Sequence, residues 1–469
     1  MKKINKYLWI CLPMLLAATG CKKYLDINQN PNAANEPPIA GLLANVTYTS
    51  AYNTFDISNI TSYYVQYLAS PNPGSDLDTY QPVDPSTAWG DLYNTLTDLQ
   101  VMRSLGEQNQ LNAYVGVADI LIAYNLSMGT NIWGDMPYSE AFQGVTNLTP
   151  HFDHQEGLYD TCLALIARGI QALQQPDAAG ELDASSDFIH HGDVQAWTKT
   201  AYALQARLLN LVSKTSLYQP SAVLDALSHA YASNADDAEI TSFATRNPWA
   251  QVALNNAGLL LDGWLSSYFI DAMNGKTYGV FDPRLPLITD TTVYGDYRGT
   301  PNGAGRQSSG TEHKECYLIE GKFYSADNGP LLMITYAECK FMEAEAAFRA
   351  GDKNHAYQAY LDGIRANMTK MNVPDTAIQR YTNDPAVAVG AANITLALIM
   401  KEKYAACFLS PVTWDDMRRM DYAYKNFQLP VNAALSTFIR RVDYPSTEIT
   451  RNGQNVPNVQ LSDHLWWDK

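Results

Sequence analysis

The stretch "ITYAECKFMEAEAAFRAGDKNHAYQAYLDGIRANM", Ile334–Met368, predicts two consecutive amphipathic helices. The apolar residues of the first helix recur at steps of three and four and are Ile334, Ala337, Phe341, Ala344 and Phe348. Those of the second helix are Ala356, Tyr357, Tyr360, Leu361, Ile364 and Met368. Gly351 suits the end of the first helix and Asp352 the cap of the second. The pattern is similar to a tetratricopeptide unit, a repeat built from paired helices.

Similar helical periodicity recurs in three other parts of the chain. The expected pairs are Asp153–Leu173 with Val194–Ser213, Ala88–Leu105 with Asn112–Met128, and a shorter pair, Thr395–Leu409 with Thr413–Met420. Asp153 and Glu156 have the spacing of a capping box, which makes Asp153 the expected cap of its helix. The sequence therefore predicts an all-α protein with about four tetratricopeptide-type helix pairs.

Long irregular segments separate these pairs. Tyr67–Gly90 is rich in proline, Lys276–Glu315 is rich in Gly, Pro and Thr, and the chain from Asp421 to its end shows no helical period. Loops of this length in a compact protein are usually functional, and binding residues gather on loops held by a rigid scaffold. We therefore expect function to reside in these segments.

The N-terminus predicts export and a lipid anchor. Lys2, Lys3 and Lys6 precede the uncharged run "YLWICLPMLLAA", which is too short to span a bilayer but fits a signal peptide. The small residues before Cys21 resemble a lipobox, in which the chain is cut and the cysteine is acylated. Acyl chains would hold the protein on a membrane. The alternative is an ordinary secretory signal with an accidental cysteine.

Composition narrows the possible ligands. The formal net charge is −16, and it becomes −19 once residues 1–20 with their three lysines are removed. Such an acidic chain is a poor ligand for nucleic acid, whose binding depends on neutralising phosphates. The chain also has 30 Tyr and 9 Trp, side chains with an apolar face and a polar tip that suit both core edges and wet binding surfaces.

Signatures of catalysis and metal binding are weak. The sequence contains no H-E-x-x-H, P-loop, G-x-S-x-G or EF-hand pattern. His151 and His154 are spaced as a metal pair, but they fall at a helix start with no third ligand nearby. The carboxylate pairs Glu343/Glu345 and Asp415/Asp416 are not expected to share a face. Whether Cys162, Cys316, Cys339 or Cys407 form disulfides stays open.

Eleven short motifs follow one another along the chain: "GCKKYLDINQNPN", "TAWGDLYNTL", "NIWGDMPYSEAF", "HFDHQEGLYD", "HHGDVQAWTKTAYALQARLLNL", "FDPRLPL", "ITYAECKFMEAEAAFRAGD", "AYLDGIRANM", "IMKEKYAACFLSPVTWDDMRRM", "RRVDYPSTE" and "LWWDK". In this order they resemble the SusD/RagB family of outer-membrane nutrient-binding lipoproteins, in its SusD-like branch. The resemblance covers nearly the whole mature chain. The large residues of these motifs are interpreted first as packing residues, namely Trp89, Trp133, Trp197, Trp414, Arg418, Arg419 and Trp466.

The resemblance implies a SusD-like fold, with tetratricopeptide pairs on one side and ligand-binding loops on the other. It implies a lid, anchored by lipid to the outside of the outer membrane, over a SusC-like TonB-dependent barrel. It implies neither catalysis nor a cofactor. The expected organisation is a signal peptide at 1–20, a lipid-anchored leader at 21–40 and one SusD-like domain at 41–469. The scaffold would lie mainly at 88–215 and 331–420, and the loop-rich ligand-binding part mainly at 67–87, 216–330 and 421–469.

No fixed binding motif is carried over from the family, so ligand contacts are inferred from residue type. A sugar needs a flat aromatic surface for its C–H face and polar partners for its hydroxyls. Two irregular segments offer such sets, and the candidates are Asp76, Asp78, Tyr80, Tyr294, Asp296, Tyr297, Arg298 and Asn302. The predicted ligand is an oligosaccharide. The alternatives are a peptide, as in a RagB-type lid, a helical-repeat adaptor that binds protein partners, and an uncharacterised hydrolase.

Overall fold

The computed structural model describes residues 37–176, 182–258 and 262–469. The predicted signal peptide, Cys21 and nearly all of the predicted leader lie outside the described residues. Within the described ranges, no helix combines the length and apolar character needed to cross a membrane.

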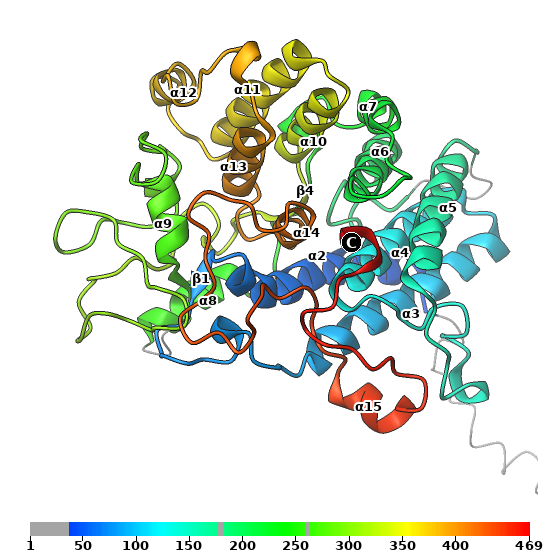
Figure 1. Ribbon diagram of the computed structural model, residues 1–469. Coiled ribbons are helices and arrows are strands. Elements are labelled where there is room, and N and C mark those ends of the chain that lie inside the picture. The colour runs from blue at the N-terminus through cyan, green and yellow to red at the C-terminus, as the bar shows by residue number, and fades with distance from the viewer. Residues whose placement is uncertain (1–36, 177–181, 259–261) are drawn as a thin grey trace, which may run out of the picture.

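The protein is mostly helical, as predicted. The main helices are α2 (Ile39–Tyr64), α3 (Ser86–Asn109), α4 (Asn112–Trp133), α5 (Gln155–Leu173), α6 (Val194–Leu211), α7 (Pro220–His229), α10 (Tyr336–Arg349), α11 (Lys353–Lys370), α12 (Asp375–Thr382), α13 (Leu396–Ala406) and α14 (Val412–Arg419). Figure 1 shows them as an arc that runs from α12 and α11 through α10, α7 and α6 to α5, α4 and α3. The longest, α2, passes through the middle of the molecule.

The opening stretch forms its two helices with one correction. Gly351 has a left-handed φ of +88°, and Asp352 accepts a hydrogen bond from the His355 N–H at 3.0 Å, so both predicted signals are confirmed. Ile334 does not begin the helix. It ends strand β4 (Leu331–Ile334), and Thr335 caps α10 by accepting from the Glu338 N–H at 3.1 Å.

The predicted cap of α5 was also wrong. Asp153 accepts hydrogen bonds from the backbone N–H groups of Tyr138 and Ser139, both at 2.8 Å. The first N–H of α5, at Gln155, instead donates to Asp135 at 2.9 Å. A nearby turn therefore takes the Asp153 carboxylate that the sequence pattern assigned to the helix.

The helix pairs form as expected, but their neighbours extend the array. Contacts join α3 to α4, α10 to α11 and α13 to α14, while α5 lies between α4 and α6. Helix α6 also packs against α7, a helix that the sequence pattern did not predict.

The regions expected to be loop-rich contain short elements. Besides α7, they include α8 (Pro248–Ala257), α9 (Ser267–Met273), α15 (Ser446–Asn452), β1 (Leu68–Ala69), β2 (Ala238–Ile240) and β3 (Trp264–Leu265). Strand β1 pairs antiparallel with β3, and β2 with β4. The long segment from Lys276 to Glu315 has only the 3-10 turn Leu285–Leu287 and otherwise runs as open loops beside α9 (Figure 1).

Helix α2 is the main element that sequence reasoning missed. It buries polar residues as well as apolar ones, among them Thr47, Ser50, Asn53, Thr54 and Ser58. Their side chains bond within the core; the Asn53 amide, for example, donates to Asn125 Oδ1 at 2.8 Å. A helix buried on several faces with small polar residues has no apolar stripe to detect.

The motif residues interpreted as packing residues lie in the interior, except that Trp466 is half-buried against Tyr159. The four cysteines left open above, Cys162, Cys316, Cys339 and Cys407, are buried free thiols.

Candidate functional site

Three loop segments that are far apart in sequence meet in a buried junction, formed by residues 70–80, 300–306 and 428–434. Its centre is Asp78, whose Oδ1 accepts from Asn302 Nδ2 at 2.5 Å and whose Oδ2 accepts from the Gly303 N–H at 2.6 Å. Asn302 also donates to the Leu68 carbonyl at 2.9 Å and accepts from the Ser266 hydroxyl at 2.6 Å. Burial raises the pKa of Asp78 to about 6, although the bonds from Gly303 and Asn302 oppose this.

The third segment closes the junction through backbone contacts. The Val431 N–H donates to the Asn302 carbonyl at 2.9 Å, and the Ala434 N–H donates to the Thr79 carbonyl at 2.8 Å. Gly303 has φ +78°, and a Cβ there would lie 1.9 Å from the Val431 carbonyl oxygen. The position therefore requires glycine for both its backbone conformation and its space.

The first set of predicted ligand residues belongs mostly to this junction. Asp78 and Tyr80 are buried, and the Tyr80 ring packs edge-on against Tyr64 with centroids 5.8 Å apart. This corrects the expectation that both face a ligand, because their polar and aromatic surfaces are used in the interior. Asn302, from the second set, is buried in the same way. Asp76 stays exposed at the start of a short 3-10 turn.

The second set divides into an exposed part and an anchored part. Tyr294 is 57% exposed, and the Arg298 guanidinium lies 4.4 Å from its ring centroid. Arg298 Nε also bonds Asp296 Oδ2 at 2.7 Å. A hydrogen bond from Thr292, with that from Arg298, lowers the pKa of Asp296. Tyr294, Asp296 and Arg298 thus form a charged set with an aromatic ring at the surface.

Tyr297 does not join Tyr294 as a second stacking surface. Its half-buried ring packs against the core and against Phe281, with ring centroids 5.8 Å apart. The Tyr297 carbonyl also accepts a bond from Asn274 at 3.3 Å. This tyrosine anchors the loop, which corrects its interpretation as a ligand contact.

Beside the junction, a cleft of about 240 Å³ opens between α9 and the loops. Carboxamides gather in its wall, at Gln66, Asn302, Asn426 and Gln428, and sequence reasoning missed all of them except Asn302. The Gln66 amide donates to the Gln428 carbonyl at 2.7 Å. The same wall holds the ion pair of Lys276 and Asp271, whose atoms are 2.6 Å apart. Asn426 and Gln428 lie in the predicted loop from Asp421 onward. Their place in that loop was the only feature of the sequence that could have indicated a role in binding.

The cleft offers hydrogen-bond donors and acceptors, and the exposed set offers an aromatic ring beside two charged groups. Pro301 and Asn302 of the loop that carries Tyr294 also line the cleft. Such a surface suits a ligand that is rich in hydroxyl or amide groups. The chain supplies it from three loop segments that the helical scaffold holds together.

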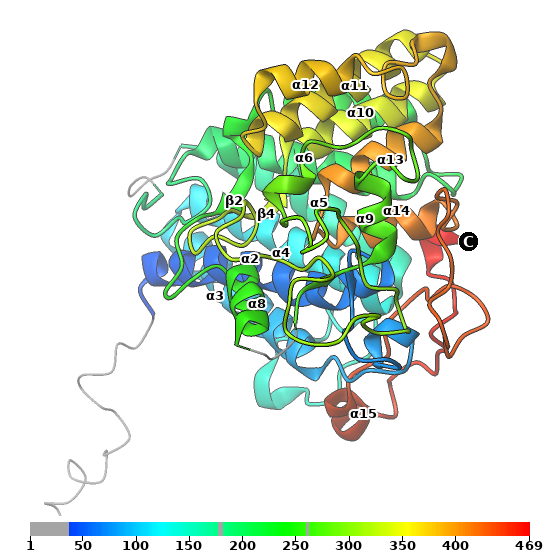
Figure 2. The ribbon, with the colours of Figure 1, turned by 90° about the vertical axis from the view of Figure 1, so that its left-hand side faces the viewer.

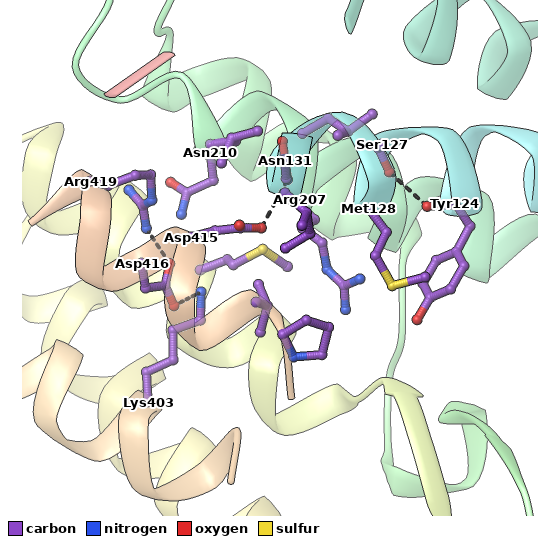
Figure 3. A pocket seen from close by; sticks show the side chains of 16 residues that line it. Tyr124, Ser127, Met128, Asn131, Arg207, Asn210, Lys403, Asp415, Asp416 and Arg419 are labelled. Atoms are coloured by element: carbon purple, nitrogen blue, oxygen red, sulfur yellow. Dashed lines mark hydrogen bonds and ion pairs between the residues drawn. The ribbon is translucent and has the colours of Figure 1, made fainter. Parts of the chain in front are cut away.

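A second polar cavity lies inside the scaffold, among α4, α6, α13 and α14 (Figure 3). Its volume of about 30 Å³ has room for water but not for a sugar. Its charges are already paired, because Asp416 bonds Arg419 at 2.6 Å and Lys403 at 2.8 Å, and Asp415 accepts from Asn131 at 2.9 Å (Figure 3). Asp415 and Asp416 thus line one cavity after all, as partners of buried cations.

The two histidines considered as a metal pair bind different carboxylates. His151 Nδ1 lies 3.2 Å from Glu140, and His154 Nδ1 lies 2.9 Å from Asp135. The hydrogen bond with Asp135 raises the pKa of His154. Both imidazoles are exposed, and each has its own acidic neighbour.

A rigid helical scaffold that presents a polar surface of loops is typical of binding proteins. The chain belongs to the SusD-like family, whose model matches residues 31–445 and is described as starch-binding associating with outer membrane. Members of this family are binding proteins rather than enzymes.

Solved structures of this family share the fold. A SusD/RagB family protein from Bacteroides thetaiotaomicron is 24% identical, with a TM-score of 0.73 over 92% of this chain and 99% of that one. A SusD homologue from Bacteroides uniformis is 22% identical, with a TM-score of 0.77 over 91% and 99%. A chitin-binding SusD homologue from Flavobacterium johnsoniae is 20% identical, with a TM-score of 0.76 over 92% and 98%. No curated protein matches the chain.

Proposed function

We propose that this protein is a cell-surface lipoprotein that captures oligosaccharides and serves as the lid of a SusC-like TonB-dependent transporter in the outer membrane. The observation that carries the proposal is the exposed Tyr294 ring with Asp296 and Arg298 on the loop surface of a chain in this family. The ring offers an apolar surface for the C–H face of a sugar. The two charged groups offer partners for its hydroxyls.

The anchor in this proposal is an acylated Cys21, which would hold the lid at the outer leaflet and face it outward. Cys21→Ala is expected to release the protein from membranes, because no helix in the described ranges could span them. The measurement is fractionation of cells that lack the partner barrel. A variant that remains fully membrane-bound in those cells would refute the lipoprotein assignment.

Ligand binding is tested by calorimetric titration with an oligosaccharide panel that begins with starch and chitin fragments. Stacking on one tyrosine is worth about 1–2 kcal/mol at ~25 cal/mol per Å², so Tyr294→Ala should weaken binding by about tenfold. Tyr294→Phe is the matched control, since it keeps the ring and should retain most of the affinity. Both variants should keep the wild-type melting temperature, because the ring is exposed.

A peptide is the second candidate ligand. The carboxamides of the cleft favour it, because amide side chains pair well with peptide backbone groups. A peptide library titrated beside the sugars separates the two. Binding of peptides alone would replace the first proposal with a RagB-type function. Binding of neither, with a stable folded protein, would refute both ligand classes.

A further inference from the structure

A groove of about 350 Å³ runs between α2 and α3 and shares no lining residue with the loop cleft. The two helices pack side by side (Figure 2). Helix α2 lines the groove with Asn45, Tyr48, Thr49, Tyr52, Asn53 and Asp56, which fall on one face at steps of three and four. Helix α3 lines it with Asp91, Asn94, Thr95 and Asp98. None of these residues was considered as a candidate from the sequence.

The groove is negatively charged and its charges are not neutralised. Among the described residues that line it, three are aspartates and none is a lysine or arginine. Asp98 accepts a hydrogen bond from Asn45 at 2.7 Å, whereas Asp56 and Asp91 have no ion-pair partner in the described part of the chain. Burial, followed by the charge of Asp91, raises the pKa of Asp56 to about 6. The two carboxylates therefore repel each other, and no described lysine or arginine lines the groove between them.

The floor of the groove holds a buried asparagine whose side-chain oxygen the fold leaves unpaired. Asn53 is 2% exposed, and its Nδ2 donates to Thr95 Oγ1 at 3.1 Å and to Asn125 Oδ1 at 2.8 Å. Its Oδ1 has no hydrogen-bond partner among the described residues. Thr49 Oγ1, from another side chain that lines the groove, is buried and has no hydrogen-bond partner among the described residues. Because buried polar atoms in folded proteins are rarely left unpaired, the two side chains suggest a partner that comes from outside the chain.

An aromatic wall completes the groove. Tyr48 and Tyr52 stack with ring centroids 4.6 Å apart, and Phe188 and Phe243 pack edge-on against them. The Tyr52 hydroxyl donates to the Arg246 carbonyl at 3.4 Å, which ties the wall to the segment that follows β2. A pair of tyrosines beside free carboxylates is a common arrangement for binding organic cations, because the ring face attracts positive charge.

We propose that the groove between α2 and α3 binds a ligand that carries a primary ammonium group on an apolar body. The ammonium has three donors, which match the carboxylates of Asp56 and Asp91 and the free Oδ1 of Asn53. The apolar body lies against Tyr48 and Tyr52. A neutral sugar would leave the two aspartates unneutralised, and so the charge selects against it.

Two sources can supply this chemistry, an amino sugar and a lysine side chain. The probes are a fully deacetylated glucosamine tetrasaccharide, its N-acetylated counterpart and a tetralysine peptide. The acetylated sugar differs from the first probe only in lacking the ammonium groups. Calorimetric titration of the full chain at neutral pH and low salt measures each dissociation constant.

Binding of either ammonium probe, with at least tenfold weaker binding of the acetylated sugar, supports the proposal. The probe that binds identifies the source. Asp56→Asn and Asp91→Asn should each weaken that binding by about tenfold, since each removes a charge-assisted contact. Asp91 is exposed, so Asp91→Asn keeps the test valid if Asp56→Asn unfolds the protein.

Asp225→Asn is the matched control for the net charge of the protein. Asp225 is an exposed aspartate on α7 that lies outside the groove, and its substitution should leave the affinity unchanged. The proposal is overturned if the acetylated sugar binds as well as the ammonium probes, or if no ammonium probe binds. It is also overturned if the two groove variants bind like the Asp225 variant.

Discussion

Replacing Arg419 by methionine should test how the scaffold is held together. Arg419 lies on α14 and reaches Glu345 of α10, with its Nη1 and Nη2 atoms 2.8 and 2.9 Å from the two carboxylate oxygens. It also donates to Asp416 at 2.6 Å and to the Ser213 hydroxyl, just after α6, at 2.6 Å. One guanidinium thus links α14 to α10 and to the turn that follows α6.

The expected loss follows from burial. The side chains of Glu345 and Arg419 are 0% and 1% exposed, so water cannot replace the lost bonds. Glu345 would keep Arg349 and Asn210 as partners, and Asp416 would keep Lys403. Breaking a buried pair by removing one member typically costs 3–5 kcal/mol, and these remaining partners place Arg419→Met near about 3 kcal/mol.

Urea denaturation followed by circular dichroism measures the free energy of unfolding. The double variant Arg419→Met/Glu345→Gln should recover part of the loss, because it removes the buried charge that has lost its bidentate partner. The matched control is Arg365→Met, since Arg365 is half-exposed and pairs with Asp362 at the surface, where an ion pair is worth at most about 1 kcal/mol. A loss no larger than that of the control, or a double variant worse than the single one, would refute this reasoning.

Three further predictions concern the core and the junction. The cations beside Glu345, of which Arg419 is the foremost, outweigh the effect of burial and lower the pKa of Glu345. The stabilising contribution of this carboxylate is therefore present above pH ~4.5 and is lost as the pH falls below that value. Acid denaturation of Glu345→Gln should be shallower than that of the wild type. Gly303→Ala should lower the free energy of unfolding by more than the roughly 1–2 kcal/mol of a strained φ, whereas Gly295→Ala, with φ +77° and open space around it, should cost only that strain in the same denaturation assay. Trp197→Ala should cost about 3–5 kcal/mol by thermal unfolding, because its side chain is fully buried and its Nε1 donates to Asp187 at 2.7 Å; a cost below 1 kcal/mol would contradict its assignment as a packing residue.

The sequence by itself determined the helical scaffold. Steps of three and four residues placed most of the helices in the arc to within a few residues, because a helix repeats locally and its apolar stripe appears in a short window. The end of α10 at Gly351 and the cap of α11 at Asp352 were correct for the same reason. The irregular character of Lys276–Glu315 was equally local, since its glycines and prolines cannot sustain a helix.

Only the tertiary structure decided which loop residues remain free to meet a ligand. Asp78 and Asn302 are 224 positions apart, and nothing in either segment indicated that their side chains would bond in the interior. Tyr294 and Tyr297 have similar sequence surroundings, yet one is exposed and the other packs against the core. Exposure depends on which distant segments arrive nearby, and residue type alone carries no record of that.

The same limit explains α2 and the groove beside it. Its buried Thr, Ser and Asn residues are stable only because other helices supply hydrogen-bond partners, so its sequence alone predicts no buried helix. Asp56 and Asp91 are brought together because α2 packs against α3. Local periodicity therefore gives the paired helices of the arc, whereas α2 and the binding surfaces depend on packing between segments that are far apart in the chain.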